Sequence, residues 1–213
     1  MARIELKNIR IASLIPHEDV LESRVREIVE DIKVRGLKYP IVVDRESRII
    51  IDGHHRVEAF KRLGITKIPA VLVDYGSDLV DIKRWFYIYK RKNEPIDIFY
   101  INSSEIITRV IRRIVRYLRP GNVEIVIKTL RYHTKIFHDN LHEAYWLLHN
   151  ATIDLPLVKI PEDQYVGEIP VIYTPHISKY HVIMYAKIGK ILPPKTTRHI
   201  FYFEIPEVNY RIN

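Results

Sequence analysis

The sequence predicts a mixed α/β (α+β) fold in two domains, residues 1–93 and residues 94–213. Apolar residues recur at the spacing of helices and at the spacing of strands in turn, so the two kinds of element follow one another along the chain. A polar stretch from Lys90 to Pro95 then separates a regular first part from a looser second part. A length of 213 residues is enough for two small domains.

The first domain is expected to alternate helices and short strands. Apolar residues from Leu21 to Ile32 have helical spacing, and Gly36 just beyond them is a typical helix end. The other expected elements are strands at 41–43 and 48–51 around a turn at 44–47, a helix at 54–63 closed by Gly64, and a strand at 70–74 after Pro69.

The second domain is expected to contain more strands and at least two helices. We expect strands at 85–89, 96–101, 123–127 and 170–173, a helix capped by Ser103 or Ser104 that runs to Leu118, and a helix at 141–148. Four arginines, Arg109, Arg112, Arg113 and Arg116, fall on the polar side of the first helix. The segment 176–187 fits a helix or a strand, and 193–199 is too polar and proline-rich for a core.

Composition excludes several classes of protein. The chain has no Cys, which excludes disulfides, thiolate metal sites and a cysteine nucleophile. No apolar run approaches the roughly 20 residues that cross a bilayer, and the N-terminus lacks the pattern of a secretion signal. We therefore expect a cytoplasmic protein without a membrane partner. Abundant Ile, Lys, Arg and Glu favour a thermophilic source.

The balance of charge is basic, because 34 Lys and Arg against 26 Asp and Glu give a net charge of +8. Positive charge favours phosphate-bearing partners, which include nucleic acids, nucleotides and phosphorylated metabolites. The basic residues are spread along the chain without a run of five or six, so the charge is weak evidence for nucleic acid and suits nucleotides and phosphorylated metabolites equally well. Nucleic acid is not expected as a partner.

A strand, a tight turn and a helix meet at Asp52-Gly53-His54-His55-Arg56. Glycine permits the turn, and the first amides of the helix carry partial positive charge that attracts anions. Two imidazoles and a guanidinium add side-chain donors, so Gly53, His54, His55 and Arg56 are predicted to bind phosphate. The alternative is a turn in which Asp52 caps the helix and the other side chains are only solvated.

A metal site made by the two histidines is not expected, because neighbouring side chains on a helix point roughly 100° apart. No HExxH pattern accompanies them. Asp52 is instead a candidate contact for a Mg²⁺ ion carried on a nucleotide, since Mg²⁺ typically uses one or two carboxylates together with phosphate oxygens.

Two further segments carry reactive groups. Glu18, in Ile15-Pro16-His17-Glu18, precedes the first expected helix, and its alternative role is an exposed carboxylate stabilised by the helix dipole. Residues Lys195-Thr196-Thr197-Arg198-His199 combine charges, hydroxyls and an imidazole, which are the donors that a phosphate or a carboxylate needs. The alternative for this segment is a solvated loop.

These segments resemble the ParB/sulfiredoxin superfamily and, within it, the archaeal free-serine kinases. The resemblance covers most of the chain in four segments that follow in the same order, while the region from about Asp97 to Pro170 diverges. The four segments are Pro16-His17-Glu18, Asp52 to Arg56, Asp74-Tyr75-x-Ser77-Asp78 with Trp85 downstream, and Pro194 to His199.

The resemblance separates this chain from two other branches of the superfamily. Sulfiredoxins have a catalytic Cys where His54 stands here. ParB partition proteins have a Gly-Glu-Arg-Arg-type box followed by a helix-turn-helix domain, whereas here Gly53 to Arg56 replaces the box and no such domain is evident downstream.

The resemblance implies a kinase that transfers the terminal phosphoryl group of ADP or ATP to free L-serine. The product, O-phospho-L-serine, would supply cysteine synthesis. A ParB/sulfiredoxin-like domain at 1–93 would bind the nucleotide phosphates, with Pro40 and Ile41 near the base, and residues 94–213 would complete the serine site. Glu18 would be the general base, with Asp52 as its rival or as a Mg²⁺ contact. The implied serine-binding residues are Trp85, Lys195, Thr196, Thr197, Arg198 and His199.

Two other functions stay open on the sequence alone. One is a ParB-like nucleotide-dependent DNA-binding module, and the other is a kinase for a different small hydroxyl compound. The expected partners of the favoured function are L-serine and an adenine nucleotide with Mg²⁺. The sequence leaves open whether the donor is ADP or ATP and whether the protein is a monomer or a homodimer.

Overall fold

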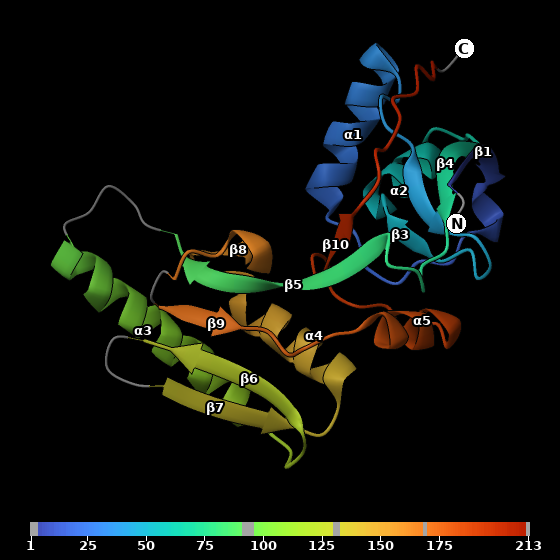
Figure 1. The fold of residues 1–213 in the computed structure, drawn as a ribbon. Coiled ribbons are helices and arrows are strands. Elements are labelled where there is room, and N and C mark those ends of the chain that lie inside the picture. The colour runs from blue at the N-terminus through green and yellow to red at the C-terminus, as the bar shows by residue number, and fades with distance from the viewer. Residues whose placement is uncertain (1–3, 91–95, 130–132, 168–169, 212–213) are drawn as a thin grey trace. The chain divides into compact units, whose positions relative to one another are not determined.

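The computed structural model describes residues 4–90, 96–129, 133–167 and 170–211, and it divides the chain into two compact units (Figure 1). The first unit comprises residues 1–82, 178–194 and 199–213, and the second comprises 83–177 and 195–198. Two C-terminal segments therefore belong with the N-terminal unit. The expected domain boundary between residues 93 and 94 lies outside the described residues and stays a prediction.

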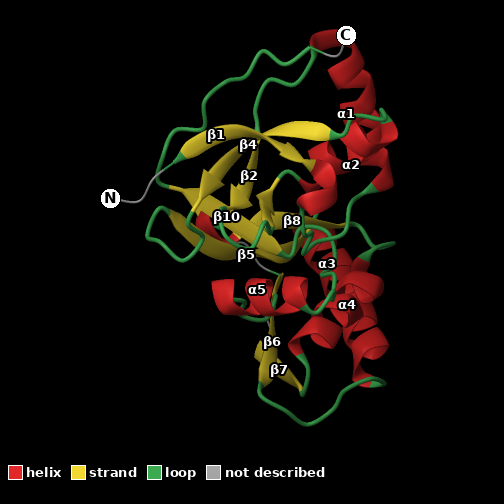
Figure 2. Cartoon of the chain, turned by 90° about the vertical axis from the view of Figure 1, so that its right-hand side faces the viewer, coloured by secondary structure: helices red, strands yellow, loops and turns green. Residues whose placement is uncertain are grey.

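The first unit is built on a four-stranded sheet. Its elements are β1 (Glu5–Arg10), α1 (Glu22–Arg35), β2 (Ile41–Asp44), β3 (Ile50–Asp52), α2 (His54–Arg62), β4 (Lys67–Val73) and α5 (Lys179–Lys187). The strand order is β1-β4-β2-β3, in which β2 and β4 are parallel and the other pairs are antiparallel. Helices α1 and α2 lie side by side, and α2 also contacts β2 and β4 (Figure 2).

The core of the first unit explains most of its predicted elements. Val25 and Ile32 of α1 pack with Phe60 of α2 and with buried residues of the sheet. Helix α1 ends at Gly36, whose φ is 76° and whose N–H donates to the carbonyl of Ile32. The predicted helices and strands of this region are confirmed, whereas β1 escaped prediction because its six residues, Glu-Leu-Lys-Asn-Ile-Arg, are largely polar and exposed.

The second unit combines a second sheet with two helices. Its elements are most of β5 (Val80–Tyr89), α3 (Ile96–Val115), β6 (Val123–Lys128), β7 (His133–His138), α4 (Leu141–Thr152), β8 (Leu157–Pro161), β9 (Val171–Tyr173) and the start of β10 (Thr197–Phe201). The strand order is β10-β5-β9-β6-β7, with β8 also paired to β5. Its core contains Ile107, Val110 and Ile114 of α3 with Ala144 and Leu148 of α4.

The structure corrects the prediction for residues 96–118. Residues 96–101 were expected to form a strand, but they begin α3, which runs without a break to Val115. Ser103 is 1% exposed inside this helix, so it does not cap its start. The β-branched and aromatic residues of 96–101 favour a strand only weakly, and a helix that already packs its apolar face in a core propagates through them.

Two C-terminal predictions are also resolved. Residues 179–187 form a helix, α5, so the ambiguous segment is helical there. The segment 193–199 was expected to be too polar for a core, but Thr196 is 1% exposed and Thr197 is 9% exposed. Threonine hydroxyls tolerate burial when they find hydrogen-bond partners, so polarity alone misplaced this segment. In the described part of the chain, no helix is long and apolar enough to cross a membrane.

Candidate functional site

Helix α2 opens at a turn that requires glycine. Gly53 is the N-cap with a φ of 105°, and a Cβ atom there would lie 2.5 Å from Cγ2 of Ile41. Asp52 bonds to Arg56 and to no other described residue, so it does not cap the helix. The backbone N–H groups of the first turn therefore have no side-chain cap within the described ranges, and with the helix dipole they favour an anion.

Arg56 fixes the turn to the segment before β2. Its guanidinium donates to Oδ2 of Asp52 at 2.6 Å and to the carbonyls of Tyr39 at 2.9 Å and Pro40 at 2.5 Å. Three of its five N–H donors are thus engaged, and only the other two remain for a phosphate. Ile41 is fully buried next to this network. The expected contacts of Pro40 and Ile41 with a nucleotide base stay predictions.

His54 and His55 hold the loop that carries Glu18. Nε2 of His54 accepts the backbone N–H groups of His17 at 3.2 Å and Glu18 at 3.4 Å. Nε2 of His55 accepts the backbone N–H of Leu21 at 3.0 Å. The sequence predicted both imidazoles as phosphate donors, but these nitrogens are acceptors. The proton of neutral His54 is therefore assigned to Nδ1, which is its one ring donor for a ligand.

Burial keeps the histidines of this cluster neutral. His17 is 0% exposed, and its burial lowers its pKa to about 4. The pKa of His54 is held well below 6.5 first by burial and then by electrostatic interaction with the nearby His17, because two protonated rings would repel each other. Nδ1 of His17 is 2.8 Å from the carbonyl of Ile50, so the neutral ring donates there.

Glu18 is held in place from two sides. Its side chain is 12% exposed, which overturns the alternative of an exposed carboxylate. Besides His54, Leu192 holds the backbone around Glu18 through a β-bridge. The N–H of Leu192 donates to the carbonyl of His17, and the carbonyl of Leu192 accepts the N–H of Asp19. Oε1 of Glu18 lies 3.9 Å from Nε2 of His17, but a neutral ring with its proton on Nδ1 forms no ion pair with it.

His199, a predicted site residue, joins this cluster through Tyr75. Its Nε2 lies 2.8 Å from the Tyr75 hydroxyl, and its ring also bonds the carbonyl of Ile51. The centres of the His17 and His199 rings are 5.7 Å apart, and those of His17 and His54 are 4.5 Å apart. Burial lowers the pKa of His199 and raises that of Tyr75, so the phenol donates to a neutral imidazole.

Tyr75 and Lys179 are members of this cluster that the sequence did not assign. The Tyr75 pKa is raised first by burial and then by the negative charge of Glu18, which places the carboxyl group near the phenol. Nζ of Lys179 lies 5.7 Å from the centre of the Tyr75 ring and donates to the carbonyl of Ser77 at 2.8 Å. Tyr75 belongs to one of the four segments on which the family resemblance rests, so the sequence offered a signal for it. Lys179 lies in the segment 176–187, whose pattern fitted a helix or a strand, so the sequence offered none.

The second unit brings Trp85 together with residues 195–198. Nε1 of Trp85 donates to the carbonyl of Thr197 at 2.9 Å, and Nζ of Lys195 lies 5.2 Å from the Trp85 ring centre. Lys159 donates to the carbonyl of Lys195 at 2.9 Å. Lys195 has a φ of 55°, a strained conformation for a residue with a side chain, and such strain is commonest at functional sites.

Arg198 has a buried nitrogen that lacks a hydrogen bond. Its Nε is buried without a partner among the described residues, and the nearest carboxylate oxygen, Oδ1 of Asp163, is 3.6 Å away. The ion pair with Asp163 is too long for a hydrogen bond, and a buried guanidinium nitrogen without one is costly, so Arg198 fits a site that an anionic ligand completes.

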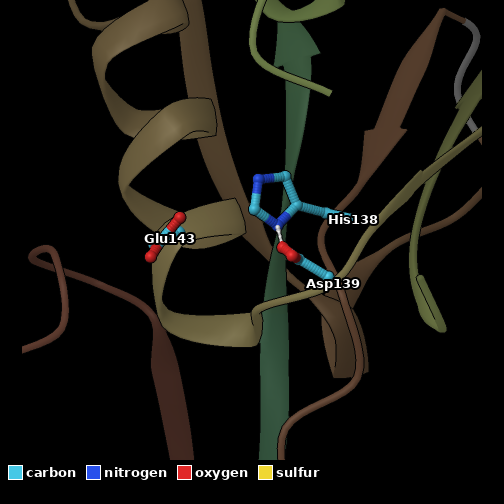
Figure 3. A group of neighbouring side chains, drawn as sticks. All are labelled: His138, Asp139 and Glu143. Carbon is cyan, nitrogen blue, oxygen red and sulfur yellow. Dashed lines mark ion pairs between the residues drawn. The ribbon is translucent and has the colours of Figure 1, made fainter. Parts of the chain in front are cut away.

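Figure 3 shows a separate group in the second unit, formed by His138, Asp139 and Glu143, whose candidate metal-ligand atoms lie within 4.8 Å of one another. Nδ1 of His138 accepts the backbone N–H of Asn140 at 3.0 Å, so its lone pair is engaged. Glu143 lies 3.4 Å from Arg119. We interpret this group as support for the start of α4 rather than as a metal site.

Comparison with known proteins places the chain in a family. Residues 1–82 match the model of the ParB N-terminal domain. A ParB-like protein from Sulfolobus acidocaldarius is 30% identical over 207 residues, which cover 97% of this chain and 96% of that protein. The chain belongs to the ParB-like family. The expected ParB-like fold of the N-terminal region is thereby confirmed.

Other relatives in this comparison carry the name of an enzyme. An ATP-dependent L-serine kinase from Staphylothermus marinus is 24% identical, with 94% of this chain and 86% of that protein covered. An ADP-dependent L-serine kinase from Thermococcus kodakarensis is 23% identical, with 99% and 93% covered. A structure of free serine kinase in complex with AMP superposes with a TM-score of 0.72 at 21% identity, covering 97% and 91%, which shows a shared fold.

Proposed function

We propose that this ParB-like protein is a small-molecule kinase that transfers the terminal phosphoryl group of ATP or ADP to the hydroxyl of free L-serine. One observation carries the proposal: the backbone N–H of Glu18, whose carboxyl group is largely buried, donates to His54 at the uncapped start of helix α2. The relatives named L-serine kinases match nearly the whole chain and support this acceptor. They differ in the donor, so the assay must include both nucleotides.

The start of α2 supplies the electrostatics that phosphoryl transfer needs. This reaction depends on in-line positioning and on neutralising the oxygens of the transferred group more than on covalent help. The N–H groups after Gly53 and the helix dipole attract the donor phosphates, and Nδ1 of His54 adds a neutral donor. The bonds made by Arg56 keep this turn rigid, so these groups need no rearrangement when charge develops.

Glu18 is the stronger candidate for the general base. Its carboxyl group is shielded from water, and its backbone is held by His54 and Leu192, which fixes it for proton transfer from the serine hydroxyl. Asp52, its rival, has a side chain that is 48% exposed and bonds to Arg56 through Oδ2. An exposed carboxylate beside a phosphate site suits a Mg²⁺ ion that arrives on the nucleotide.

Such an ion, when bound, would neutralise phosphate charge. Asp52 offers one carboxylate for it, in keeping with the one or two that Mg²⁺ typically takes beside phosphate oxygens. The residues of this chain, and not the metal, provide the base and the amides in the proposal.

Serine binding is assigned to Trp85 and to residues 195–199. Free serine carries a carboxylate and an ammonium group, so its pocket needs fixed charges. The Nε of Arg198, which is buried without a hydrogen bond, supports this residue as the partner of an anionic group. Thr196, Thr197, Lys195 and His199 complete the proposed set. The product, O-phospho-L-serine, would then serve cysteine synthesis.

The direct test is to incubate the protein with L-serine, Mg²⁺ and either ATP or ADP, and to measure O-phosphoserine by mass spectrometry. Glu18→Gln is expected to lower kcat by roughly 10²- to 10⁴-fold, the usual value of a general base. Glu27→Gln is the matched control, because Glu27 is an exposed glutamate that pairs with Arg24 on helix α1. It should retain full activity.

Two results would redirect the proposal. If neither donor yields O-phosphoserine but another small alcohol is phosphorylated, the kinase is retained and the acceptor is wrong. If the protein phosphorylates no alcohol and binds duplex DNA tightly in a salt-sensitive way, the ParB-like DNA-binding function replaces it. Unchanged turnover in Glu18→Gln would remove Glu18 from the chemistry and leave Asp52 as the base.

A further inference from the structure

Helices α3 and α4 of the second unit contact each other (Figure 2). Residues of both helices and of the loops that follow and precede them line a groove that the proposed kinase does not use. Two cavities of about 410 Å³ and 570 Å³ share four lining residues, so they form one continuous groove. The shared residues are Arg116, Tyr117, Leu147 and Asn150. Arg112 and Arg113 line one end, and Arg119 and Glu143 line the other.

The four arginines of this groove fall into two kinds. Arg113 donates to both carboxylate oxygens of Asp154 and to the carbonyl of Ala151, and Arg119 lies near Glu143. Arg112 and Arg116 are exposed and make no hydrogen bond or ion pair with any residue that the structure describes. The paired arginines support the groove, and the unpaired ones leave it positively charged.

The two unpaired arginines lie at the end of α3. Arg112 is in the last turn of the helix and Arg116 follows directly after its last residue, and like charges near one another repel. Attraction to the negative end of the helix dipole offsets part of this repulsion, since α3 ends at Val115. That attraction explains a basic residue in the last turn, but it does not explain an aromatic ring and a groove beside the two guanidiniums.

Tyr117 supplies the aromatic ring. It is 65% exposed at the centre of the groove, although a tyrosine ring usually packs at least partly into a core. Leu147 and Ala151 add apolar surface and Asn150 adds an amide. Guanidiniums, an exposed ring and an apolar floor are the groups that bind phosphates and unstacked bases together.

We propose that this groove binds single-stranded nucleic acid, with Arg112 and Arg116 on backbone phosphates and Tyr117 stacked on a base. A duplex fits the groove less well, because paired bases hide the faces on which Tyr117 would stack. A free nucleotide also fits less well, since small-ligand pockets bury most of their ligand and this groove is open. The inference does not depend on the kinase activity.

The test is fluorescence anisotropy of the full-length protein with labelled oligouridylate and oligothymidylate of about 16 nucleotides, the upper end of typical site sizes. Binding should weaken with salt. Arg112→Gln/Arg116→Gln should weaken it by about tenfold and reduce the slope of log K against log[salt] by about 1.4, since each phosphate contact on a single strand contributes roughly 0.7. Tyr117→Ala should weaken binding by about fivefold to 100-fold, and Tyr117→Phe should not.

Arg24→Gln/Arg109→Gln is the matched control, because it removes the same charge from two exposed arginines that are already paired with glutamates outside the groove. It should bind like the unaltered protein. Since the substituted groove residues are exposed, the melting temperatures of all variants should stay close to that of the unaltered protein. Equal losses in the groove and control variants would overturn the proposal. Absence of binding, tighter binding of a duplex, or displacement by equimolar mononucleotide would do so too.

Discussion

Gly53 determines the geometry of the candidate phosphate site at the scale of one residue. We predict that Gly53→Ala lowers the free energy of unfolding by about 2–4 kcal/mol, because a φ of 105° strains alanine and the new Cβ would lie 2.5 Å from Ile41. Urea denaturation measures this loss. The variant should also bind nucleotide more weakly, because relief of the clash displaces the first turn of α2.

Gly64→Ala distinguishes the two causes of the stability loss at Gly53, which are backbone strain at positive φ and the steric clash with Ile41. Gly64 has a φ of 72°, but nothing lies within 4 Å of the Cβ position. Its substitution should therefore cost only the conformational term, about 1 kcal/mol. Equal losses in the two variants would show that Ile41 does not restrict the turn at Gly53.

The sequence predicted the turn at Gly53 because its signal is local. It did not predict that Nε2 of His54 and of His55 would accept hydrogen bonds, since the donors are the backbone N–H groups of residues 17, 18 and 21, which are distant in the chain. The same holds for the bond between Tyr75 and His199. Residue types can be recognised in a sequence, whereas the proton positions depend on partners that only the fold brings near.

At the scale of elements, β5 positions the segment at residues 195–198. We predict that Trp85→Phe removes the hydrogen bond from Nε1 to the carbonyl of Thr197, worth about 1 kcal/mol, while it keeps most of the aromatic surface. Amide hydrogen exchange of residues 195–198 should become faster, and KM for serine should rise more than kcat falls. Trp146→Phe, in α4, is the control and should leave exchange in this segment unchanged. If the amides of residues 195–198 exchange equally fast in the Trp85→Phe and Trp146→Phe variants, a positioning role for Trp85 is contradicted.

Helix α3 offers a test of where the helix begins. Ser104 is exposed in the middle of the helix, so Ser104→Pro should cost about 3 kcal/mol through a lost backbone bond and a clash with the preceding turn. A helix that began at Ser103 or Ser104 would accept proline in its first turn with little loss. Thermal unfolding distinguishes the two, and Ser104→Ala should be neutral or slightly stabilising. A small effect of proline would restore the start expected from sequence.

The elements that the sequence predicted well are those with a one-sided apolar pattern, such as α1 and α4. The prediction for residues 96–101 was wrong because this segment, with five apolar or aromatic residues around Asp97, fits a strand or a buried helix equally well when seen alone. β1 was missed for the opposite reason, since edge strands carry polar residues that resemble a loop. The difference in each case comes from tertiary packing, which overrides local propensity.

At the scale of the whole molecule, buried neutral histidines make stability depend on pH. The pKa of His17 is about 4 in the folded protein and 6.5 in the reference state, so the unfolded chain binds more protons between these values. The free energy of unfolding should therefore fall as pH drops from about 6.5 to about 4, by about 3 kcal/mol for His17 alone. His54 and His199, whose pKa values are also lowered, act in the same direction.

Urea denaturation across this pH range, with His17→Asn as the diagnostic variant, tests the assignment. The Asn amide can donate where Nδ1 of His17 does but does not titrate, so the variant should lose much of the decline between pH 6.5 and 4. His176→Asn, at an exposed histidine, should keep the full decline. The pKa values of Glu5 and Glu22 are about 2, lowered by bonds to Lys7 and Arg62, so their contribution is lost only below their reference value of 4.5. A decline confined to that lower range would mean that carboxylates, and not the imidazoles around Glu18, control the acid response of the fold.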